Sequence, residues 1–386
     1  MRWVGSPAAG SGLSAPAELH AQRLTFPNER SSTPSGTLGV KVTFFARRLA
    51  PYTISFLRAL AARGHRLELI YEPAAGEAPF QAFDLSCCER AVADGDRSYR
   101  RAWLRRGPEQ LPDAAFIAGW VEPLERAAGR LLRRHGRPVV CGIDNPWTGS
   151  WRQQLARLVA PFRLWPMARA AWVAGEPQAE FARRLGYRWV ETGLYCADVD
   201  AYRCDLPLTQ RPRAFLFTGR LIADKGVDLL VEAYRTYRRQ VVDPMELLVA
   251  GTGPMAALTK GVEGLRPLGF VQPSDLPGWM ARCQALVLPS RDEHWGVVIH
   301  EAAAAGLPVL ASEACMAATA FVRHGESGYL YPPSAPALTA ALLGFHRLTP
   351  EQKCLMSRQS KDLALTWVPS QQAEVFERLL QRMAPA

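Results

Sequence analysis

The feature of the sequence that most constrains its fold is an alternation of strand-like and helix-like segments that occurs in two blocks. The first block spans 38–204 and the second spans 205–366, and the second opens with a polar, proline-bearing stretch at 205–212. Alternation at this spacing produces parallel sheets with helices on both faces. The chain is therefore predicted to be an α/β protein of two Rossmann-like domains, with a ligand cleft beyond the carboxyl ends of the strands.

In the first block, β-branched and aromatic runs predict strands, and apolar residues at helical spacing predict helices. The strands are expected at 40–45, 66–71, 114–118 and 138–141, with two more short strands at Val173 and Val190. The helices are expected at 51–63, 122–135 and 176–185.

In the second block, each expected strand leads into a helical segment. The strands are expected at 214–218, 247–250, 285–288 and 309–311, and the segments that follow them at 227–239, 254–260, 297–305 and 314–323. Beyond this block, residues 370–382 form a predicted helix. Its apolar stripe needs a surface to cover, and consists of Val375, Phe376, Leu379 and Leu380.

Composition excludes several classes of protein. The apolar share is 48%, which is ordinary for a globular chain, and no run of about 18 apolar residues predicts a membrane span. The eight cysteines form no CxxC pair and no zinc-type spacing, and no secretory signal is visible, so we expect reduced thiols in a cytoplasmic protein. Residues 1–37 are rich in Gly, Ser, Pro and Ala and are expected to be a disordered extension.

The chain carries a basic excess that lies almost entirely in its first half. The 46 basic and 36 acidic residues give a net charge of +10, of which residues 1–200 supply +8. Such an excess indicates an anionic partner, which could be nucleic acid, a membrane surface or an acidic substrate. No nucleic-acid-binding motif accompanies the charge, so nucleic acid is the least favoured of the three.

One basic stretch, Arg97–Arg106, interleaves arginines with Tyr99 and Trp103 at helical spacing. It is equally compatible with contact to an anionic membrane at the inner face of the cell membrane and with a solvated helix whose aromatic residues pack on the core. Two DxD triplets, Asp94-Gly95-Asp96 and Asp198-Val199-Asp200, resemble metal-binding motifs but are interpreted as loop acids.

The loop that follows the strand at 214–218 has the residues of a phosphate site. Gly219 permits close approach of the backbone, and Arg220 and Lys225 place two cations before a helix start that begins after Gly226. A guanidinium fork and an ammonium point charge suit a diphosphate. The alternative is an ordinary loop with solvated cations.

A second group of residues follows the strand at 285–288. Glu293 and Glu301 lie eight positions apart and bracket Trp295-Gly296, which marks the turn into a helix. Carboxylates accept paired hydrogen bonds from vicinal hydroxyls such as those of a ribose or a hexose, and Gly296 leaves backbone N–H groups accessible to an anion. The alternative is that Glu301 merely complements the helix dipole.

Taken in order, these motifs resemble the retaining glycosyltransferases of family 4, which have the GT-B fold. The resemblance holds over roughly 205–345, and the first block resembles the family more loosely, with Ala50-Pro51-Tyr52 where many members have a Gly-rich acceptor loop. His294-Trp295 stand where Pro-Phe is commoner. The motifs that carry the resemblance are Gly219-Arg220, Lys225-Gly226, Ala250-Gly251-Thr252-Gly253-Pro254, Pro289-Ser290, Glu293, Glu301-Ala302, Ala305-Gly306-Leu307-Pro308-Val309, Gly325 and Gly328.

The resemblance implies roles for the matching residues. Arg220 and Lys225 match positions that hold the diphosphate of a nucleotide-sugar donor. Glu301 matches the carboxylate on the ribose, and Glu293 matches the one that faces the transferred sugar. These four residues are the expected catalytic group. The further residues expected at the donor are Gly219, Gly251, Gly253, Trp295, Gly296 and Val297.

The implied reaction is transfer of a sugar, with retention, from a nucleotide-diphosphate sugar to a lipid-linked or glycan acceptor in cell-surface polysaccharide biosynthesis. The leaving phosphate takes the acceptor's proton, so no general base, cofactor or metal is expected. The acceptor is expected to bind the first domain near Tyr52, Asp144 and Asn145. Asp144 and Asn145 follow a strand end, and they are at least as compatible with a buried structural turn. By the same resemblance, the helix within 367–386 is expected to pack back on that domain.

Two other classes of function share this architecture. One is a nucleotide-sugar 2-epimerase, which would need acid and base groups deep in the cleft. The other is a sugar-binding protein without catalysis, which the absence of a visible signal peptide disfavours.

Overall fold

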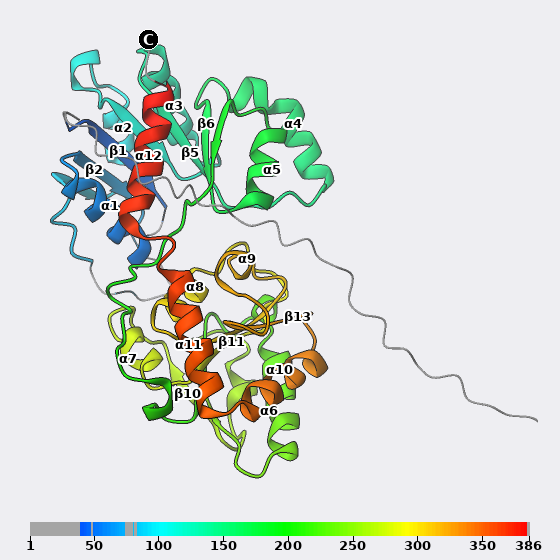
Figure 1. Cartoon of the computed structure of the whole chain (residues 1–386). Helices are drawn as coiled ribbons and strands as arrows, with labels where there is room; N and C mark the ends of the chain where they lie inside the picture. Colours follow the sequence, from blue (N-terminus) through cyan, green and yellow to red (C-terminus); the bar gives the residue numbers. More distant parts are fainter. Residues whose placement is uncertain (1–38, 48, 74–79, 81–82, 384–386) are drawn as a thin grey trace, which may run out of the picture.

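The computed structural model describes residues 39–47, 49–73, 80 and 83–383. Figure 1 shows two α/β domains, one above the other, with the last helix running along the upper one. The expected disordered extension at 1–37 lies outside the described residues. Among the residues that are described, no helix combines the length and the apolar character needed to cross a membrane.

Over its described residues, the N-terminal domain has a seven-stranded parallel sheet with the order β3-β2-β1-β4-β5-β6-β7. The strands are β1 (Lys41–Ala46), β2 (Arg66–Tyr71), β3 (Arg90–Ala93), β4 (Ala114–Ile117), β5 (Val139–Ile143), β6 (Ala170–Val173) and β7 (Trp189–Glu191). The helices are α1 (Pro51–Ala62), α2 (Ser98–Trp103), α3 (Pro123–Arg134), α4 (Trp151–Arg163) and α5 (Glu176–Arg184).

The described part of the C-terminal domain has a six-stranded parallel sheet with the order β10-β9-β8-β11-β12-β13. Its strands are β8 (Ala214–Thr218), β9 (Glu246–Ala250), β10 (Leu265–Gly269), β11 (Ala285–Leu288), β12 (Val309–Ser312) and β13 (Gly328–Tyr331). Its helices are α6 (Val227–Gln240), α7 (Leu276–Met280), α8 (Val297–Ala304), α9 (Ala318–Phe321), α10 (Ala335–Arg347) and α11 (Pro350–Ala364), after which α12 (Pro369–Met383) returns to the other domain.

The two parallel sheets confirm the predicted α/β fold of two Rossmann-like domains. The central strands β5, β6, β11 and β12 are wholly buried, as expected for strands covered by helices on both faces. The strands that the sequence pattern missed, β3, β10 and β13, all lie at sheet edges. Edge strands keep polar or proline residues, such as Arg266 and Pro267 in β10, and these interrupt the apolar run that marks a strand.

Helix α12 joins the two domains by packing on the N-terminal one. Its Phe376 is fully buried, with ring centroids 5.6 Å from both Phe44 and Trp172 and 5.8 Å from Phe56. Ahead of it, the indole of Trp367 donates a hydrogen bond of 3.1 Å to the Tyr195 carbonyl. The last helix therefore completes the core of the domain that the chain left at residue 204.

An ion pair fixes the other side of α12. Glu377 accepts two hydrogen bonds of 2.7 Å from the Arg63 guanidinium and lies 2.9 Å from the His65 ring. Burial raises the pKa of Glu377, but the hydrogen bonds from Arg63 and His65 outweigh it and lower the pKa to about 2. The carboxylate therefore stays ionised at neutral pH and holds α12 against the end of α1.

The structure decides between the two interpretations of Arg97–Arg106. Arg100 is 1% exposed and pairs with Asp94 and Glu125, so the first DxD triplet supplies an internal ion-pair partner. Trp103 is 2% exposed, and its indole donates to Glu68, which also pairs with Arg106. The aromatic residues of this stretch thus pack on the core and its main cations are neutralised. The burial of Arg100 and Trp103 therefore favours the interpretation of this segment as a helix packed on the core.

Candidate functional site

The two groups of motif residues meet where the strand order of the C-terminal sheet reverses. Strands β8 and β11 are neighbours in space, whereas the chain runs from β8 to β9 on one side and from β11 to β12 on the other. A crevice opens beyond the carboxyl ends of the strands at such a switch point, and ligands of α/β proteins bind there. The Arg220–Lys225 loop leaves β8 and the Glu293 loop leaves β11, so both border this crevice.

Two glycines let these loops approach each other closely. A Cβ atom on Gly226, which has a φ of +66°, would lie 2.1 Å from the Pro289 carbonyl oxygen. A Cβ atom on Gly251 would lie 1.9 Å from the Gly219 carbonyl oxygen. Larger residues would therefore separate the loops after β8, β9 and β11.

A cavity of about 300 Å³ lies between these loops and the start of α1. It brings together Gly219, Arg220, Gly251, Val297 and Glu301 from the C-terminal domain. Tyr52 from α1 closes it on the N-terminal side. Phe80 adds a second contact between the domains, with its ring centroid 5.7 Å from that of Phe270. The cavity is thus shared by the two domains, and five of the residues that line it are among the predicted catalytic and donor-binding residues.

Lys225 and Glu293, which are not among the residues that line this cavity, pair with each other between the loops after β8 and β11. The Lys225 Nζ lies 2.5 Å from Glu293 Oε2, and the two side chains are 15% and 17% exposed. The same loops are held by Arg291, whose guanidinium donates two hydrogen bonds, of 2.7 and 2.6 Å, to Asp228. Lys225, which is predicted to bind phosphate, and Glu293, which is predicted to face the sugar, therefore form an ion pair across the switch point.

Glu301 is the most deeply buried of the four predicted catalytic residues, at 8% exposure. Burial raises its pKa to about 7, although a hydrogen bond from the Tyr202 hydroxyl opposes the shift. Tyr202 also lines the cavity and comes from the chain between the two domains. Sequence reasoning missed Tyr202, because no motif marks it. Only the fold brings it to Glu301.

The remaining predicted donor residues lie around the turn into α8 and after β9. Gly296, with a φ of +89°, is the N-cap of α8 and leads to Val297 at the cavity wall. The side chain of Trp295 is 4% exposed and turns away from the cavity, where it lies so close to Gly175 that a Cβ there would be 2.6 Å from its ring. Gly253 is packed under Leu221 and is not among the residues that line the cavity.

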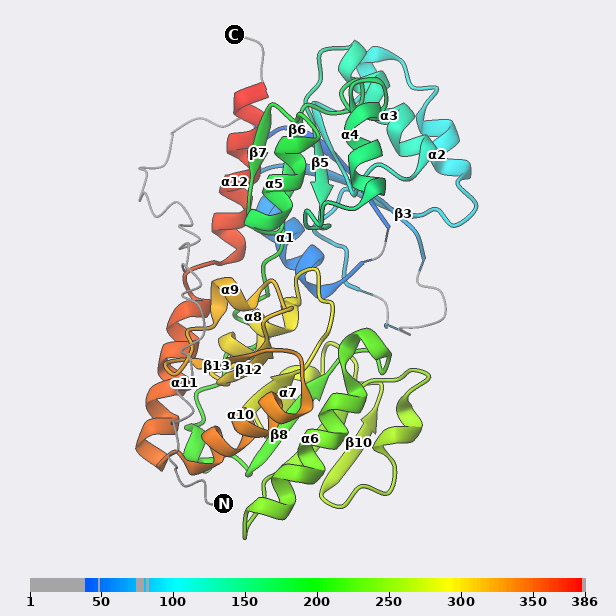
Figure 2. The same ribbon diagram turned by 90° about the vertical axis from the view of Figure 1, so that its right-hand side faces the viewer.

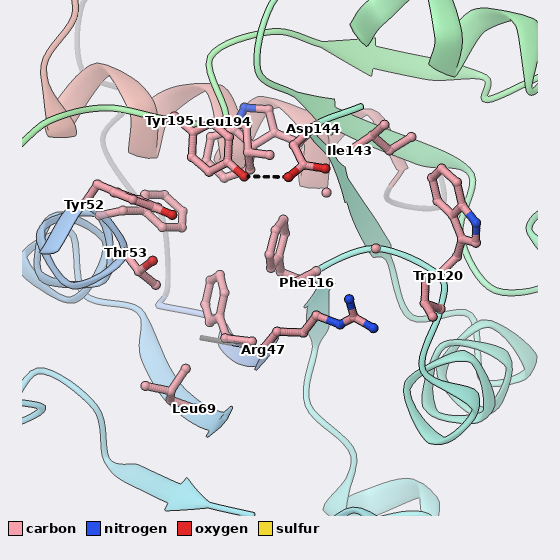
Figure 3. Close-up of a pocket in the computed structure, with 18 of the residues that line it drawn as sticks. Arg47, Tyr52, Thr53, Leu69, Phe116, Trp120, Ile143, Asp144, Leu194 and Tyr195 are labelled. Atoms are coloured by element: carbon pink, nitrogen blue, oxygen red, sulfur yellow. Dashed lines mark hydrogen bonds between the residues drawn. The ribbon is translucent and has the colours of Figure 1, made fainter. Parts of the chain in front are cut away.

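A larger cavity of about 700 Å³ lies in the N-terminal domain at the equivalent switch point, between β1 and β4. It brings together the three predicted acceptor residues, Tyr52, Asp144 and Asn145. In Figure 3, the Tyr195 hydroxyl points to Asp144, to which it donates a hydrogen bond of 3.5 Å, and Arg47 extends from the opposite wall.

Tyr52 lines both cavities. Burial raises its pKa to about 12, and the negative charges of Asp144 and Glu301 add to this effect. Tyr52 thus lies near Asp144 of the N-terminal domain and Glu301 of the C-terminal domain. Its hydroxyl stays protonated at neutral pH and can donate a hydrogen bond. Arg47 and Tyr195 were not foreseen as lining residues, because neither belongs to a motif.

The structure also places the residues considered for metal binding. In the part of the chain that the structure describes, no three His, Cys, Asp or Glu side chains are grouped so that they could hold a metal ion. Asp96 caps the backbone N–H of Ser98, and Asp198 accepts from the backbone of Ala201. These contacts are typical of loop acids.

Comparison with known proteins relates the C-terminal half to one family. Residues 212–347 match the family model described as "Glycosyl transferases group 1". The chain is 37% identical over 158 residues to D-inositol 3-phosphate glycosyltransferase of Jonesia denitrificans, a match that covers 37% of each chain. It is 30% identical over 184 residues to D-rhamnosyltransferase WbpZ of Pseudomonas aeruginosa, which covers 43% of this chain and 46% of that one. The chain thus spans less than half the length of the curated relatives it matches.

Solved structures extend the likeness to both domains. Anabaena HepE in complex with UDP and glucose superposes with a TM-score of 0.68 at 15% identity, over 89% of this chain and 99% of that one. Sucrose-phosphate synthase from Thermosynechococcus elongatus superposes with a TM-score of 0.66 at 16% identity, again over 89% and 99%. Together with the two parallel sheets, these superpositions show that the fold is GT-B.

Proposed function

Because residues 212–347 match the group 1 glycosyltransferase model and the fold is GT-B, we propose that the chain is a glycosyltransferase of the family-4 type, which transfers a sugar from a nucleotide-diphosphate donor to an acceptor held by its N-terminal domain. The observation that carries this proposal is that Arg220 and Glu301 line one cavity at the switch point of the C-terminal sheet, with Lys225 on the same loop as Arg220. HepE, which shares the fold, has been crystallised with UDP and with glucose, and this supports a nucleotide sugar as the donor.

In this proposal, the diphosphate lies against Arg220 and Lys225, and the N–H groups at the start of α8 face its oxygens. As the anomeric C–O bond breaks, the leaving diphosphate gains negative charge, and fixed cations and N–H dipoles stabilise it. Lys225 is held beside Glu293 at 2.5 Å, so its ammonium is oriented before the donor binds. Glu301 accepts hydrogen bonds from ribose hydroxyls, and Glu293 faces the transferred sugar.

The proposal places the acceptor in the cavity lined by Tyr52, Asp144 and Asn145. The acceptor hydroxyl then approaches the donor past Tyr52, which borders both cavities. We propose that the leaving phosphate takes the acceptor's proton, so that the sugar keeps its anomeric configuration without a general base from the protein. A lipid-linked or glycan acceptor of surface-polysaccharide assembly, met by a cytoplasmic enzyme at the inner membrane face, is the proposed context.

The experiment that tests this function is incubation with a panel of UDP-, GDP- and ADP-sugars, followed by chromatography and NMR. We expect slow release of the nucleoside diphosphate from at least one of them and a sugar whose first-formed anomer is the one present in the donor. A 2-epimerase would invert the configuration at C2 of the nucleotide sugar, and a binding protein would leave the nucleotide sugar intact. Either result would contradict the proposal.

Metal removal gives a separate prediction. Because fixed cations and helix N–H groups are proposed to stabilise the leaving diphosphate, turnover should be unchanged in excess EDTA. The check is the initial rate of nucleoside diphosphate release with EDTA, with added Mg²⁺ and with neither. A rate that falls to background in EDTA and returns with Mg²⁺ would show that a divalent ion performs this task.

The raised pKa of Glu301 gives a pH prediction. With a pKa of about 7, Glu301 is protonated below neutrality and loses the carboxylate that accepts from the ribose. The kcat/KM for the donor should therefore decline as pH falls through about 7. In Glu301→Gln the decline of kcat/KM below pH 7 should be absent, and kcat/KM should be low at every pH. If the decline of kcat/KM at low pH persists in Glu301→Gln, the titrating group is a residue other than Glu301.

A further inference from the structure

One helix of the N-terminal domain exposes an apolar stripe that the proposed donor and acceptor sites do not use. Among the described residues, ten large apolar side chains are exposed, and four of them lie on α4: Trp151, Leu155, Leu158 and Phe162. Their exposed fractions are 70%, 51%, 73% and 79%. Because they are spaced by three or four residues, they form a single stripe along the helix.

The stripe points away from the protein. On the opposite side of α4, Ala160 is fully buried and Ala156 packs against the core of the domain. Figures 1 and 2 show α4 on the outside of the upper domain, with no other helix over its outer side. A contiguous exposed apolar surface of this kind, on a helix already anchored by its other face, marks an interaction site.

The charged residues in the segment that carries the stripe have one sign. Residues 145–169 contain four arginines and no acidic residue. Three of these arginines lie on α4 itself and flank the stripe, namely Arg152, Arg157 and Arg163, and all three are exposed. An apolar stripe of Trp, Leu and Phe bordered by arginines matches the surface of an anionic lipid bilayer, where apolar side chains enter the acyl boundary and cations meet the headgroups.

Helix α3 adds further positive charge close to Arg163, and one of its arginines also contacts residues that line the larger cavity. The pKa of Arg126 is lowered by burial and then by the positive charges of Arg163 and Arg130. Arg126 also donates hydrogen bonds of 2.6 and 2.7 Å to the carbonyls of Trp120 and Val121, two residues that line the 700 Å³ cavity. The acidic residues near by, Glu122 and Glu125, are buried in ion pairs with Arg97 and Arg100.

We propose that α4 docks the protein on an anionic membrane, with Trp151, Leu155, Leu158 and Phe162 in the acyl boundary and the flanking arginines at the lipid phosphates. The inference goes beyond the proposed glycosyl transfer and does not depend on it. It moves the expected membrane contact from Arg97–Arg106, whose aromatic residues pack against the core, to a helix whose aromatic residues are exposed.

The test is sedimentation of the full chain with vesicles of phosphatidylcholine and phosphatidylglycerol, and with vesicles of phosphatidylcholine alone. The wild type should bind the anionic vesicles and bind the neutral ones at least about tenfold more weakly. Leu158→Glu with Phe162→Glu should weaken binding to anionic vesicles by at least about tenfold, because two side chains proposed to enter the acyl boundary of the bilayer become charged. Arg152→Glu with Arg157→Glu should weaken it by about tenfold or more.

The matched control is Leu355→Glu, the same change at a residue that is 49% exposed on α11 of the other domain. It should bind anionic vesicles like the wild type. Since every position changed on α4 is exposed, circular dichroism should show an unchanged fold. The inference is overturned if the wild type does not bind anionic vesicles, or if the α4 variants bind as well as Leu355→Glu. It is equally overturned if ultracentrifugation shows that the stripe joins two copies of the chain.

Discussion

Lys225→Ala is expected to lower kcat/KM for the nucleotide sugar by roughly 30- to 1,000-fold, which corresponds to about 2–4 kcal/mol of transition-state stabilisation. The reason is that Lys225 lies at the loop after β8 with its ammonium already oriented by Glu293 at 2.5 Å. The loss should fall mainly on kcat, because the diphosphate gains its additional charge only as the glycosidic bond breaks. Steady-state release of the nucleoside diphosphate is the measurement.

The substitution also leaves Glu293 without its cation, so a control must separate that effect. In Lys225→Ala with Glu293→Gln, the stranded carboxylate is removed. Because Glu293 is itself placed at the transferred sugar, the reference for this double variant is Glu293→Gln alone. If repulsion between Glu293 and the diphosphate were the whole cause, the double variant would turn over as fast as Glu293→Gln, and the assignment of Lys225 would fall. Lys260→Ala, at an exposed lysine of the same domain, should keep the wild-type rate. Arg220→Ala should show a loss similar to that of Lys225→Ala.

Phe376→Ala is expected to destabilise the N-terminal domain by about 3–5 kcal/mol, the usual cost of removing a buried phenylalanine ring. Phe376 is fully buried although it comes from the last helix of the chain, and it contacts Phe44, Phe56 and Trp172. Without the ring, α12 loses its main anchor, and the cavity shared by the two domains loses its fixed geometry. Turnover should therefore fall together with stability.

Urea denaturation followed by tryptophan fluorescence measures this effect. Phe376→Leu should cost much less than Phe376→Ala, because it keeps most of the buried volume. Leu355→Ala, at a half-exposed position on α11, should stay within about 0.5 kcal/mol of the wild type. A Phe376→Ala protein that unfolds at the wild-type urea concentration would show that α12 is not required for the N-terminal core.

The two-domain fold and the donor-side residues could be predicted because they are local in sequence. Each strand of the C-terminal domain's centre is an apolar run followed within a few residues by its loop and helix. Gly219, Arg220 and Lys225 therefore fall on one loop and Glu293 falls on another. The adjacency of these two loops follows from the strand order, which parallel α/β topology restricts to few arrangements.

What could not be predicted depends on contacts between distant residues. Tyr202 carries no motif, yet folding places its hydroxyl on Glu301. The sequence is equally compatible with a membrane contact and with a packed helix at Arg97–Arg106, because the partners Glu68 and Glu125 lie far away in the sequence. Conversely, nothing in the apolar spacing of α4 distinguishes an exposed stripe from a buried one. That distinction requires knowing which face of the helix the sheet covers.

The central claim is that the switch point of the C-terminal sheet binds a nucleoside diphosphate through Arg220 and Lys225. The most direct measurement is calorimetric titration of the wild type, Arg220→Ala and Lys225→Ala with the nucleoside diphosphate and monophosphate of the base selected by the sugar-nucleotide panel. We predict that the wild type binds the diphosphate at least about tenfold more tightly than the monophosphate and that each substitution removes most of this difference. Equal affinity of the wild type for both nucleotides, or an unchanged preference in both variants, would contradict the account.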